Sequence, residues 1–527
     1  MSRTAARPAS RGVVTSVRFG RRRCRMRAMP AGLDLGSSSV KAVTAPPARA
    51  GGAARRRIAT RRLPGGRVEH DAEAIFAAAL SALRAALPRR SRNLEALGLA
   101  TQRSTVLFWD RDTGRPLTPA YSWQDLRGAP LVSRLRREAR SGGDLDETIG
   151  RRTGLRLSPH YSASKLSWAL RHVRGLRRRV ASGRALWGTL GTFLVWRLSG
   201  GAVYAVDHAN AQRTLLFDLD SRSWEPELFD TFGLGALVEA PALPAALPTT
   251  LTSPICLRRS GLPLRLCAMT GDQQAALIGL GCRAEGAITI NYGSGAFVLI
   301  STGERLVRVP GLLTTLLASW RGDRPGAHPT VLYAVEGPVN AAATAIDWAR
   351  KRLRLRLRIA DLDRFLAGDR GPRRRVHFLP AVAGLGAPRW DPAARPRFAG
   401  DLRRAGPRDL MRAVVESIAF RCAEIVRAAP PRDGPRGASI LVAGGLTRCR
   451  TLLQTQADLL QRPIVVRETP DATGLGAALL TRDPAGWWGR HDTARDRLSV
   501  PPRMSRDEAD ARYLAWVRAV YGPEASR

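Results

Sequence analysis

An aspartate stands at the start of a short apolar run in residues 269–277, MTGDQQAAL. An unpaired carboxylate is costly inside a buried strand, so we expect Asp272 in a loop that lines a cleft. There it could accept the proton of a hydroxyl that attacks a γ-phosphate, as aspartate bases do in phosphoryl transfer. A second interpretation makes Asp272 the N-cap of a helix in QQAALIGLG. Capping alone leaves Gly271 and the glutamine pair unexplained.

Two turns rich in glycine and serine could hold phosphate oxygens. The segments AGLDLGSSSVKAV (31–43) and AITINYGSGAFVLI (287–300) each read as a β-hairpin with a tight turn. Such turns offer backbone N–H groups and small hydroxyls to a polyphosphate. The groups are Gly36, Ser37, Ser38 and Ser39 in the first turn, with Lys41 two residues beyond, and Gly293, Ser294 and Gly295 in the second. Each alone is an ordinary hairpin turn, but their pairing favours one shared phosphate ligand.

A carboxylate also precedes the first turn. Asp34 and Asp272 could converge on one cleft, because each lies next to one of the two hairpins. Mg²⁺ prefers oxygen ligands and is commonly held by one or two carboxylates together with substrate phosphates. The sequence therefore predicts a magnesium site at Asp34, bound directly or through water, with Asp272 nearby.

The elements around these residues repeat one pattern twice. A helix is expected in HDAEAIFAAALSALRAAL (70–87), a strand in LEALGLATQ (94–102), and a buried strand, a Gly-Gly turn and an amphipathic helix in 439–460. The turn at Gly444 and Gly445 lets backbone approach a phosphate or nucleoside closely. Strands mixed with helices in both halves indicate an α/β protein with two domains that face one cleft.

The expected domains are residues 29–268 and 269–527. The proline-rich segment 240–263 reads as a surface connection rather than a regular element, and we place the hinge just before Asp272. Residues 1–28 are rich in arginine, contain no acidic residue and lack the apolar stretch of a secretory signal. They are expected to be a transit-like tail or, as we favour, an upstream extension outside the fold.

Composition excludes several classes of protein. The net charge of +41 comes almost entirely from arginine spread along the chain, since only three lysines are present, which argues against a specific nucleic-acid role and favours an anionic substrate such as ATP. Six scattered cysteines show no metal-binding spacing and are expected to be reduced thiols in the cytoplasm. No apolar stretch reaches the ~18 residues of a membrane span.

Several motifs together resemble the FGGY carbohydrate kinases, and among them most closely the glycerol kinases. They are GLDLGSSSVKA, ATQRSTVLFWDRDTGRPL, SWQDLRG, GDQQAAL, NYGSGAF, YAVEG, GLGAPRWDPAARPRFAG and QADLLQRPI…ATGLGAALL, in this order from residue 31 to the C-terminal ARYLAWVRAV. The resemblance implies two actin-like (ribonuclease H-like) ATPase domains flanking a central cleft. It also implies transfer of the γ-phosphoryl group of Mg-ATP to a terminal hydroxyl of glycerol or a related polyol or sugar. We expect a homo-oligomer, a dimer or a tetramer.

The resemblance also assigns site residues. Asp272 would be the catalytic base, and Asp34 with Asp272 would hold the metal. The acceptor would be bound by Gln102, Arg103, Ser104, Trp123, His160, Asp272, Gln273 and Phe297. The nucleotide would be bound by Ser37, Ser38, Ser39, Lys41, Gly293, Ser294, Gly444, Gly445 and Cys449.

The chain departs from the glycerol kinase motifs at three of these positions. Ser104 replaces the glutamate of the family's QRET, His160 takes the tyrosine position of SPYF, and Cys449 follows the Gly-Gly turn where asparagines are usual. Losing a carboxylate acceptor matters, because a site built to bond hydroxyls discriminates strongly on such partners. Two alternatives therefore stay open: a kinase for another polyol or ketose, and an inactive nucleotide-binding homologue.

Overall fold

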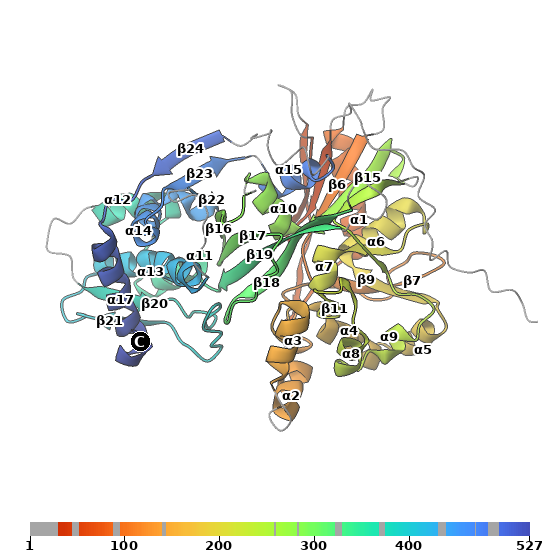
Figure 1. Cartoon of the computed structure of the whole chain (residues 1–527), viewed down its shortest axis with the longest axis horizontal. Coiled ribbons are helices and arrows are strands. Elements are labelled where there is room, and N and C mark those ends of the chain that lie inside the picture. Colours follow the sequence, from red (N-terminus) through yellow and green to blue (C-terminus); the bar gives the residue numbers. More distant parts are fainter. Residues whose placement is uncertain are drawn as a thin grey trace, which may run out of the picture.

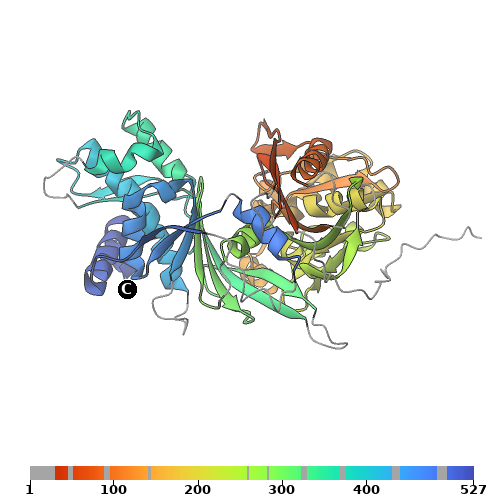
Figure 2. The ribbon, with the colours of Figure 1, turned by 90° about the horizontal axis from the view of Figure 1, so that it is seen from above.

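The computed structural model describes residues 30–44, 52–87, 95–139, 144–257, 260–281, 284–321, 329–367, 375–429, 439–469, 471–482 and 495–526. The segment 1–28, predicted as an extension, lies outside the described residues. Figures 1 and 2 show two lobes, one built from the first half of the chain and one from the second. No helix of the described part is long and apolar enough to cross a bilayer.

The two lobes contain sheets built on the same strand plan. The first sheet contains β1 (Ala31–Leu35), β2 (Ser39–Thr44), β3 (Ala53–Arg57), β6 (Glu95–Thr101), β14 (Thr250–Cys256) and β15 (Leu264–Gly271), in the order β14-β15-β6-β1-β2-β3. The second contains β16 (Ile288–Tyr292), β17 (Ala296–Gly303), β18 (Leu313–Trp320), β19 (Thr330–Val339), β22 (Ile440–Gly444), β23 (Ile464–Glu468) and β24 (Arg495–Val500), in the order β18-β19-β17-β16-β22-β23-β24. In the first sheet, β1 pairs in parallel with β6, and β6 pairs in parallel with β15. In the second sheet, β16 pairs in parallel with β22, and β22 pairs in parallel with β23. Both predicted hairpins are confirmed.

The remaining elements cover these sheets. In the first lobe they are a five-stranded sheet, in the order β4-β5-β8-β7-β9, and several small elements: β4 (Arg61–Leu63), β5 (Arg67–His70), β7 (Val106–Asp110), β8 (Ala120–Tyr121), β9 (Ala185–Thr189), β10 (Ala205–Asp207), β11 (Phe217–Asp218), β12 (Ser223–Trp224), β13 (Ala245–Leu247), α1 (Ala72–Ala86), α2 (Ala129–Ala139), α3 (Leu145–Thr153), α4 (Ser162–His172), α5 (Leu176–Ala181), α6 (Leu190–Ser199), α7 (His208–Gln212), α8 (Pro226–Thr231) and α9 (Gly235–Val238). After the first sheet come α10 (Asp272–Gly279), α11 (Ala343–Arg352), η2 (Ile359–Asp361), α12 (Leu362–Ala367), β20 (Val376–Leu379), β21 (Arg397–Gly400), α13 (Pro407–Ala428), η3 (Gly445–Arg448), α14 (Arg450–Leu460), α15 (Ala472–Leu479), α17 (Arg506–Tyr521) and η4 (Pro523–Ser526). The helix predicted in 70–87 is α1, and the strand, turn and helix predicted in 439–460 are β22, η3 and α14.

The proline-rich segment 240–263 is not a simple surface connection, so that prediction is wrong. It contains β13 and β14, and β14 pairs antiparallel with β15. Ile255 and Leu257 are buried in the core under the first sheet. Pro254 is tolerated because β14 is an edge strand, where a missing N–H leaves no ladder bond unmade. The first sheet ends with β15 at Gly271, three residues past the proposed domain boundary at 268.

Strand register brings the candidate residues of the first sheet to one edge. Thr101 at the end of β6 pairs with Leu35 in β1 on one side and with Gly271 in β15 on the other. The chain segments that leave these strands therefore start side by side. In the second sheet, Tyr292 at the end of β16 pairs with Gly444 at the end of β22. Ligands of open α/β sheets bind at such carboxyl ends.

The two lobes meet where α15 packs between α10 and the first sheet, as Figures 1 and 2 show. A Cβ added to Gly476 of α15 would lie 1.8 Å from the carbonyl oxygen of Ala275 in α10. On the other side, a Cβ on Gly98 of β6 would lie 1.8 Å from the carbonyl oxygen of Ala477. Backbone touches backbone on both sides, so only glycine fits at these positions.

A second contact between the lobes runs along β18. Gln212 donates from Nε2 to the carbonyl of Thr314 at 2.6 Å and accepts from the N–H of Leu316 at 3.0 Å. Thr249 and Ser319 exchange hydrogen bonds in both directions, at 2.9 and 2.7 Å. These buried bonds satisfy the edge of the second sheet with groups from the first lobe.

We predict that Gly476→Ala destabilises the fold by about 2 kcal/mol or more, because its methyl group has no space against Ala275. Gly150→Ala is the matched control, since Gly150 is also helical and its added Cβ would meet only an ordinary contact at 3.5 Å. The control should be neutral or stabilise by up to ~1 kcal/mol through helix propensity. Urea unfolding of the two variants measures both effects, and equal midpoints would contradict the crossing described here.

Candidate active site

Two carboxylates from distant segments flank one lysine at the edge of the first sheet, and a third lies near one of them. The Nζ of Lys41 lies 3.2 Å from Oδ2 of Asp34 and 3.2 Å from Oδ2 of Asp471. Asp471 is the N-cap of α15, where it accepts a hydrogen bond from the N–H of Gly474 at 3.1 Å. Asp272 is close enough to raise the pKa of Asp34 by charge repulsion. The two aspartates singled out from the sequence are thus brought together.

Asp34 has the properties of a metal ligand. It is 4 % exposed, and its Oδ1 has no hydrogen-bond partner. Burial, helped by Asp471 and Asp272 and opposed by Lys41, raises the pKa of Asp34 to about 7. An orphaned carboxylate oxygen beside a second carboxylate suits a divalent cation. Within the described ranges, no three His, Cys, Asp or Glu side chains form a metal-binding group on their own. A magnesium held partly by phosphate oxygens does not need a third carboxylate.

Asp272 begins α10, and Gly271 occupies the N-cap position, so the capping interpretation of Asp272 is wrong. Its Oδ1 accepts from the N–H of Gln273 at 2.8 Å and lies 3.5 Å from Nε of Arg103. The side chain is 27 % exposed. Desolvation raises the pKa of Asp272, and Arg103 acts against this rise. The carboxylate is therefore held in place through Oδ1, while the side chain stays partly exposed.

Arg103 is itself held by a glutamate from the second sheet. Its Nη1 and Nη2 donate to Oε2 and Oε1 of Glu336 in β19, at 3.0 and 3.1 Å. Arg213 and Thr315 bond to the same carboxylate, which is 2 % exposed. Burial alone would raise the pKa of Glu336, but the two guanidinium groups hold it well below its usual range. Glu336 is the acid of the motif YAVEG and is not among the predicted site residues, although an acid inside an apolar strand is a visible signal.

The first turn is tied to the expected acceptor residues. Nε1 of Trp123 donates to Oγ of Ser37 at 3.0 Å. Gln102 is buried and donates to the carbonyl of Gly36 at 3.3 Å, so it stabilises the turn from the protein interior. Ser38 is exposed, whereas Ser39 is buried in β2. The exposed part of the turn is therefore at Ser38.

Ser104 does not turn its hydroxyl toward the acceptor side. Its backbone has a φ of 63°, and Oγ donates to the carbonyl of Arg213 at 3.0 Å, buried from solvent. His160 is exposed, and its Nδ1 lies 3.1 Å from the carbonyl of Trp123. The two positions thus differ in placement: the hydroxyl of Ser104 is buried and bonded to Arg213, whereas His160 is exposed.

The residues expected at the nucleotide lie mostly at the edge of the second sheet. Gly293 and Ser294 are exposed, and the carbonyl of Ser294 accepts from the N–H groups of Ala342 and Thr344 at the start of α11. Gly444 has a φ of 102°, and a Cβ there would lie 2.1 Å from the carbonyl oxygen of Tyr292, so only glycine fits.

The other predicted residues of this half differ in exposure. Gly445 is open, with no atom within 4 Å of an added Cβ. Cys449 is fully buried, backbone included, and its thiol faces Asp363 at 3.6 Å, so the structure does not present the predicted Cys449 to a nucleotide. Phe297 and Gln273 are both half-buried.

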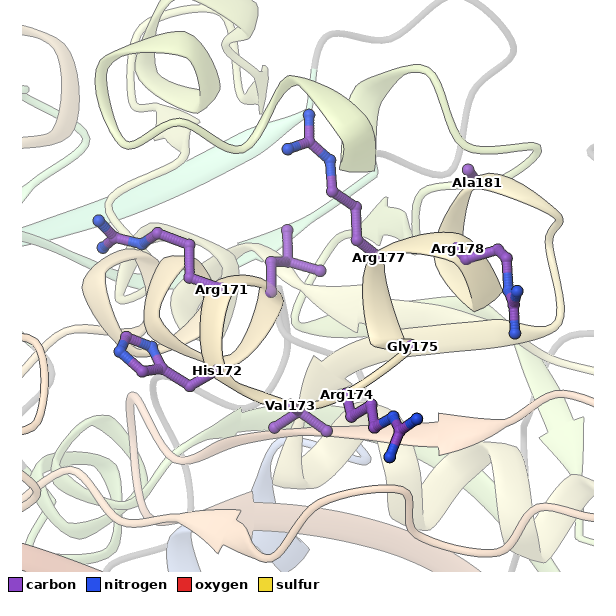
Figure 3. A pocket seen from close by; sticks show the side chains of 9 residues that line it. Arg171, His172, Val173, Arg174, Gly175, Arg177, Arg178 and Ala181 are labelled. Carbon is purple, nitrogen blue, oxygen red and sulfur yellow. The ribbon is translucent and has the colours of Figure 1, made fainter.

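A separate hollow of about 530 Å³ lies at the turn between α4 and α5 (Figure 3). It is lined by Leu170, Arg171, His172, Val173, Arg174, Gly175, Arg177, Arg178 and Ala181. None of the predicted site residues lines it. Figure 3 shows that its arginine side chains point in different directions rather than toward one point.

Comparison with known proteins decides the family. The model of the FGGY carbohydrate kinase N-terminal domain matches residues 29–279, and that of the C-terminal domain matches residues 288–482. The chain belongs to the FGGY family of carbohydrate kinases. It is therefore a phosphotransferase that acts on an alcohol group, and its family implies the use of ATP.

Similar proteins agree with this assignment. A glycerol kinase of Thermus brockianus is 38 % identical over 463 residues, which cover 86 % of this chain and 90 % of the relative. One from Aeromonas hydrophila is 33 % identical over 497 residues, 93 % of this chain and 96 % of the relative. Among solved structures, Plasmodium falciparum glycerol kinase with ADP has a TM-score of 0.79 at 24 % identity, covering 93 % of this chain and 97 % of that one. Rhodospirillum rubrum xylulose kinase has a TM-score of 0.78 at 22 % identity, covering 95 % and 100 %. These structures confirm the two-domain actin-like ATPase fold.

We predict that Glu336→Gln lowers the free energy of unfolding by about 3–5 kcal/mol, because Arg103 and Arg213 lose a buried counter-charge. Glu138→Gln is the control, since the Glu138 side chain is 62 % exposed and its pair with Arg134 should contribute at most about 1 kcal/mol. The pKa of Glu336 is depressed, so its contribution is present above its ordinary pKa of 4.5 and is lost as pH falls toward the folded value. Denaturant unfolding between pH 3 and 7 checks both statements. An equal loss of free energy of unfolding in Glu336→Gln and Glu138→Gln at pH 7 would refute the first statement, and a contribution of Glu336 that does not decrease in acid would refute the second.

Proposed function

We propose that the protein transfers the γ-phosphoryl group of Mg-ATP to a terminal hydroxyl of glycerol. The observation that carries this proposal is the convergence of Asp34 and Asp272 at the carboxyl ends of β1 and β15, beside the glycine-serine turn. Family membership supplies the reaction class, and the geometry supplies candidates for the groups that perform it.

Asp272 is proposed as the general base. Its Oδ1 is occupied by the N–H of Gln273 and faces Arg103, while the described residues form no hydrogen bond to its Oδ2. Oδ2 takes the proton of the acceptor hydroxyl as that oxygen bonds to the γ-phosphorus. The bond between the γ-phosphorus and the bridging oxygen breaks, and ADP leaves with the electron pair. Because Arg103 is fixed by Glu336, the base is held in one orientation.

Asp34, with Asp272, is proposed to hold Mg²⁺. Its unpaired buried Oδ1 and the neighbouring carboxylates fit a hard divalent cation. When bound, the metal would neutralise charge that develops on the phosphate oxygens. Lys41, Ser37 and Ser38 are proposed to bind phosphate from the first domain, whereas Ser39 is buried in β2 and is left out. Gly293, Ser294, Gly444 and Gly445 are proposed to bind the nucleotide from the second.

Glycerol as acceptor is supported by relatives named glycerol kinase at 33–38 % identity and by the family residues Arg103, Trp123, Gln273 and Phe297. A second candidate is a kinase for another polyol or ketose. It is favoured by Ser104, whose hydroxyl bonds to the carbonyl of Arg213 where the glycerol kinase motif has a carboxylate.

We further propose that the protein acts in the cytoplasm as a dimer or tetramer. Light scattering of the purified protein tests the oligomeric state.

We predict that Asp272→Asn lowers kcat by about 10²–10⁴, because the amide cannot take the hydroxyl proton. ATP binding should be retained. Desolvation raises the pKa of Asp272, so log(kcat/KM) of the wild type should fall as pH drops through that raised value. The measurement is coupled ADP release, with ATP affinity by calorimetry. Asp510→Asn is the control, because Asp510 lies in α17, its side chain is 42 % exposed and it pairs with Arg427; the activity of this variant should be unchanged. Full activity in Asp272→Asn would remove the proposed base.

A panel of glycerol, erythritol, xylulose and ribulose separates the two acceptor proposals. We expect glycerol to have the highest kcat/KM in the ADP-release assay. A large excess for a tetritol or a ketose would reject glycerol while leaving the kinase reaction in place. No turnover with any acceptor, in protein that still binds ATP, would favour the inactive homologue.

A further inference from the structure

We infer that Asp471 is a positioning residue, which keeps Lys41 beside the first glycine-serine turn when Asp34 gives up its ion pair to a divalent cation. The inference rests on the proposed function, because it concerns the proposed metal and phosphate groups of that same site. It deepens that proposal by giving a part to an acid outside the predicted site residues and by stating which partner Lys41 keeps.

Lys41 is shared between two carboxylates that are almost closed to solvent. Its Nζ lies 3.2 Å from Oδ2 of Asp34 and 3.2 Å from Oδ2 of Asp471. The side chains of these aspartates are 6 % and 5 % exposed, whereas that of Lys41 is 34 % exposed. Lys41 is therefore the member of this group that is most accessible to a ligand in solution.

The carboxylate of Asp471 is fixed relative to the strand that carries Lys41. Its Oδ1 accepts from the N–H of Gly474 at 3.1 Å. A Cβ added to Gly32 of β1 would lie 1.8 Å from the carbonyl oxygen of Gly474, so the start of α15 touches the first sheet through backbone. A Cβ on Gly474 would lie 2.8 Å from the side chain of Val43 in β2. The acid is thus held in one place, whereas the lysine has a flexible side chain.

Capping of α15 does not require the negative charge of Asp471. Asparagine and serine are equally good N-cap residues, so a neutral side chain would satisfy the N–H of Gly474 as well. A buried carboxylate has a desolvation cost that a neighbouring counter-charge offsets. Within the described ranges, the counter-charge found next to Asp471 is Lys41. The charge is therefore explained by the lysine and not by the helix.

The balance of charge around Asp34 favours one further cation. Asp34 and Asp471 carry two negative charges against the single positive charge of Lys41, and Asp272 adds its repulsion to Asp34. The unpaired Oδ1 of Asp34 offers a ligand atom to that cation. A cation bound there would repel the ammonium group, which can turn away from Asp34 and keep its pair with Asp471. Lys41 then stays beside the turn, where its charge can meet phosphate oxygens.

Lysine NMR tests the inference without turnover. The chain contains only three lysines, so the full chain labelled with ¹³C-lysine should give three ¹³Cε signals. Lys165 is fully buried and Lys351 is exposed, so they provide a rigid and a mobile reference. The signal of Lys41 is assigned by its loss in Lys41→Arg. Its relaxation reports how firmly the side chain is held.

In the wild type, saturating Mg²⁺ alone should shift the Lys41 signal without raising its mobility, because Asp471 still binds the ammonium group. Asp471→Asn keeps an N-cap and removes the charge. In this variant the mobility of Lys41 should stay low without Mg²⁺, because Asp34 remains its partner. With Mg²⁺ it should rise toward that of Lys351. Asp471→Ser, which also caps a helix, should behave in the same way.

Three results would overturn the inference. The first is a Lys41 signal that Mg²⁺ does not shift in the wild type, since the ion pair with Asp34 would then persist. The second is a low mobility of Lys41 in Asp471→Asn both with and without Mg²⁺. The third is a high mobility that is already present without Mg²⁺, because this would indicate a merely structural part for Asp471.

Kinetics of the complete enzyme test the consequence for the nucleotide. Asp471→Asn should raise the KM for ATP at saturating Mg²⁺ about three- to tenfold, the effect of one poorly placed hydrogen-bond donor, and leave the KM of the acceptor unchanged. Asp144→Asn is the matched control. Asp144 is an exposed N-cap of α3 and accepts from the N–H groups of Asp146 and Glu147 at 2.9 and 3.3 Å. Neither KM should change in the control.

The inference and the proposed function can fail separately. An active enzyme whose ATP KM is the same in Asp471→Asn would reject the inference and leave the kinase reaction in place. Absence of turnover with every acceptor would reject the proposed function, while the NMR titration would still decide which partner Lys41 keeps.

Discussion

The carboxylate of Glu336 is shared by two arginines in a position almost closed to solvent. Glu336 belongs to the second sheet, whereas Arg103 and Arg213 come from the first lobe. Pairs of this kind add little net stability, since desolvation offsets most of the attraction, but removing one partner is strongly unfavourable. Their value here is orientation. With two of its nitrogens fixed on Glu336, Arg103 presents Nε to Asp272, so groups from both lobes hold this carboxylate.

The backbone provides the second level of positioning. Three parallel strands of the first sheet end in register at Leu35, Thr101 and Gly271, so the groups after them share one edge. The second sheet repeats the arrangement with Tyr292 beside Gly444. Each lobe thus offers one glycine-containing turn at a strand end, and Asp34 and Asp272 flank the first of these edges.

Local features were predictable from the sequence, and distant partners were not. The hairpins around Gly36 and Ser294 follow from glycine and serine between alternating apolar residues, which is information carried within about a dozen positions. Glu336 contacts Arg103 across 233 positions of chain, and Asp471 reaches Lys41 from the far end of the sequence. No local pattern specifies such pairs. The prediction for the proline-rich segment is wrong because an edge strand tolerates proline, and the burial of Cys449 against Asp363 of another helix is a long-range contact as well.

The contact between α15 and its neighbours brings main chain against main chain at Gly98 and Gly476. Around these two positions, Leu475 and Leu479 of α15 pack in one buried cluster with Ile278 of α10. A small rotation of one lobe against the other about this point would displace atoms least at the crossing itself, whereas the same rotation would stretch the paired hydrogen bonds of Thr249 and Ser319 along β18. The crossing at α15 would thus act as the axis of such a rotation. The hydrogen bonds along β18 would resist it, so the resistance to a change in the angle between the lobes is concentrated at that edge.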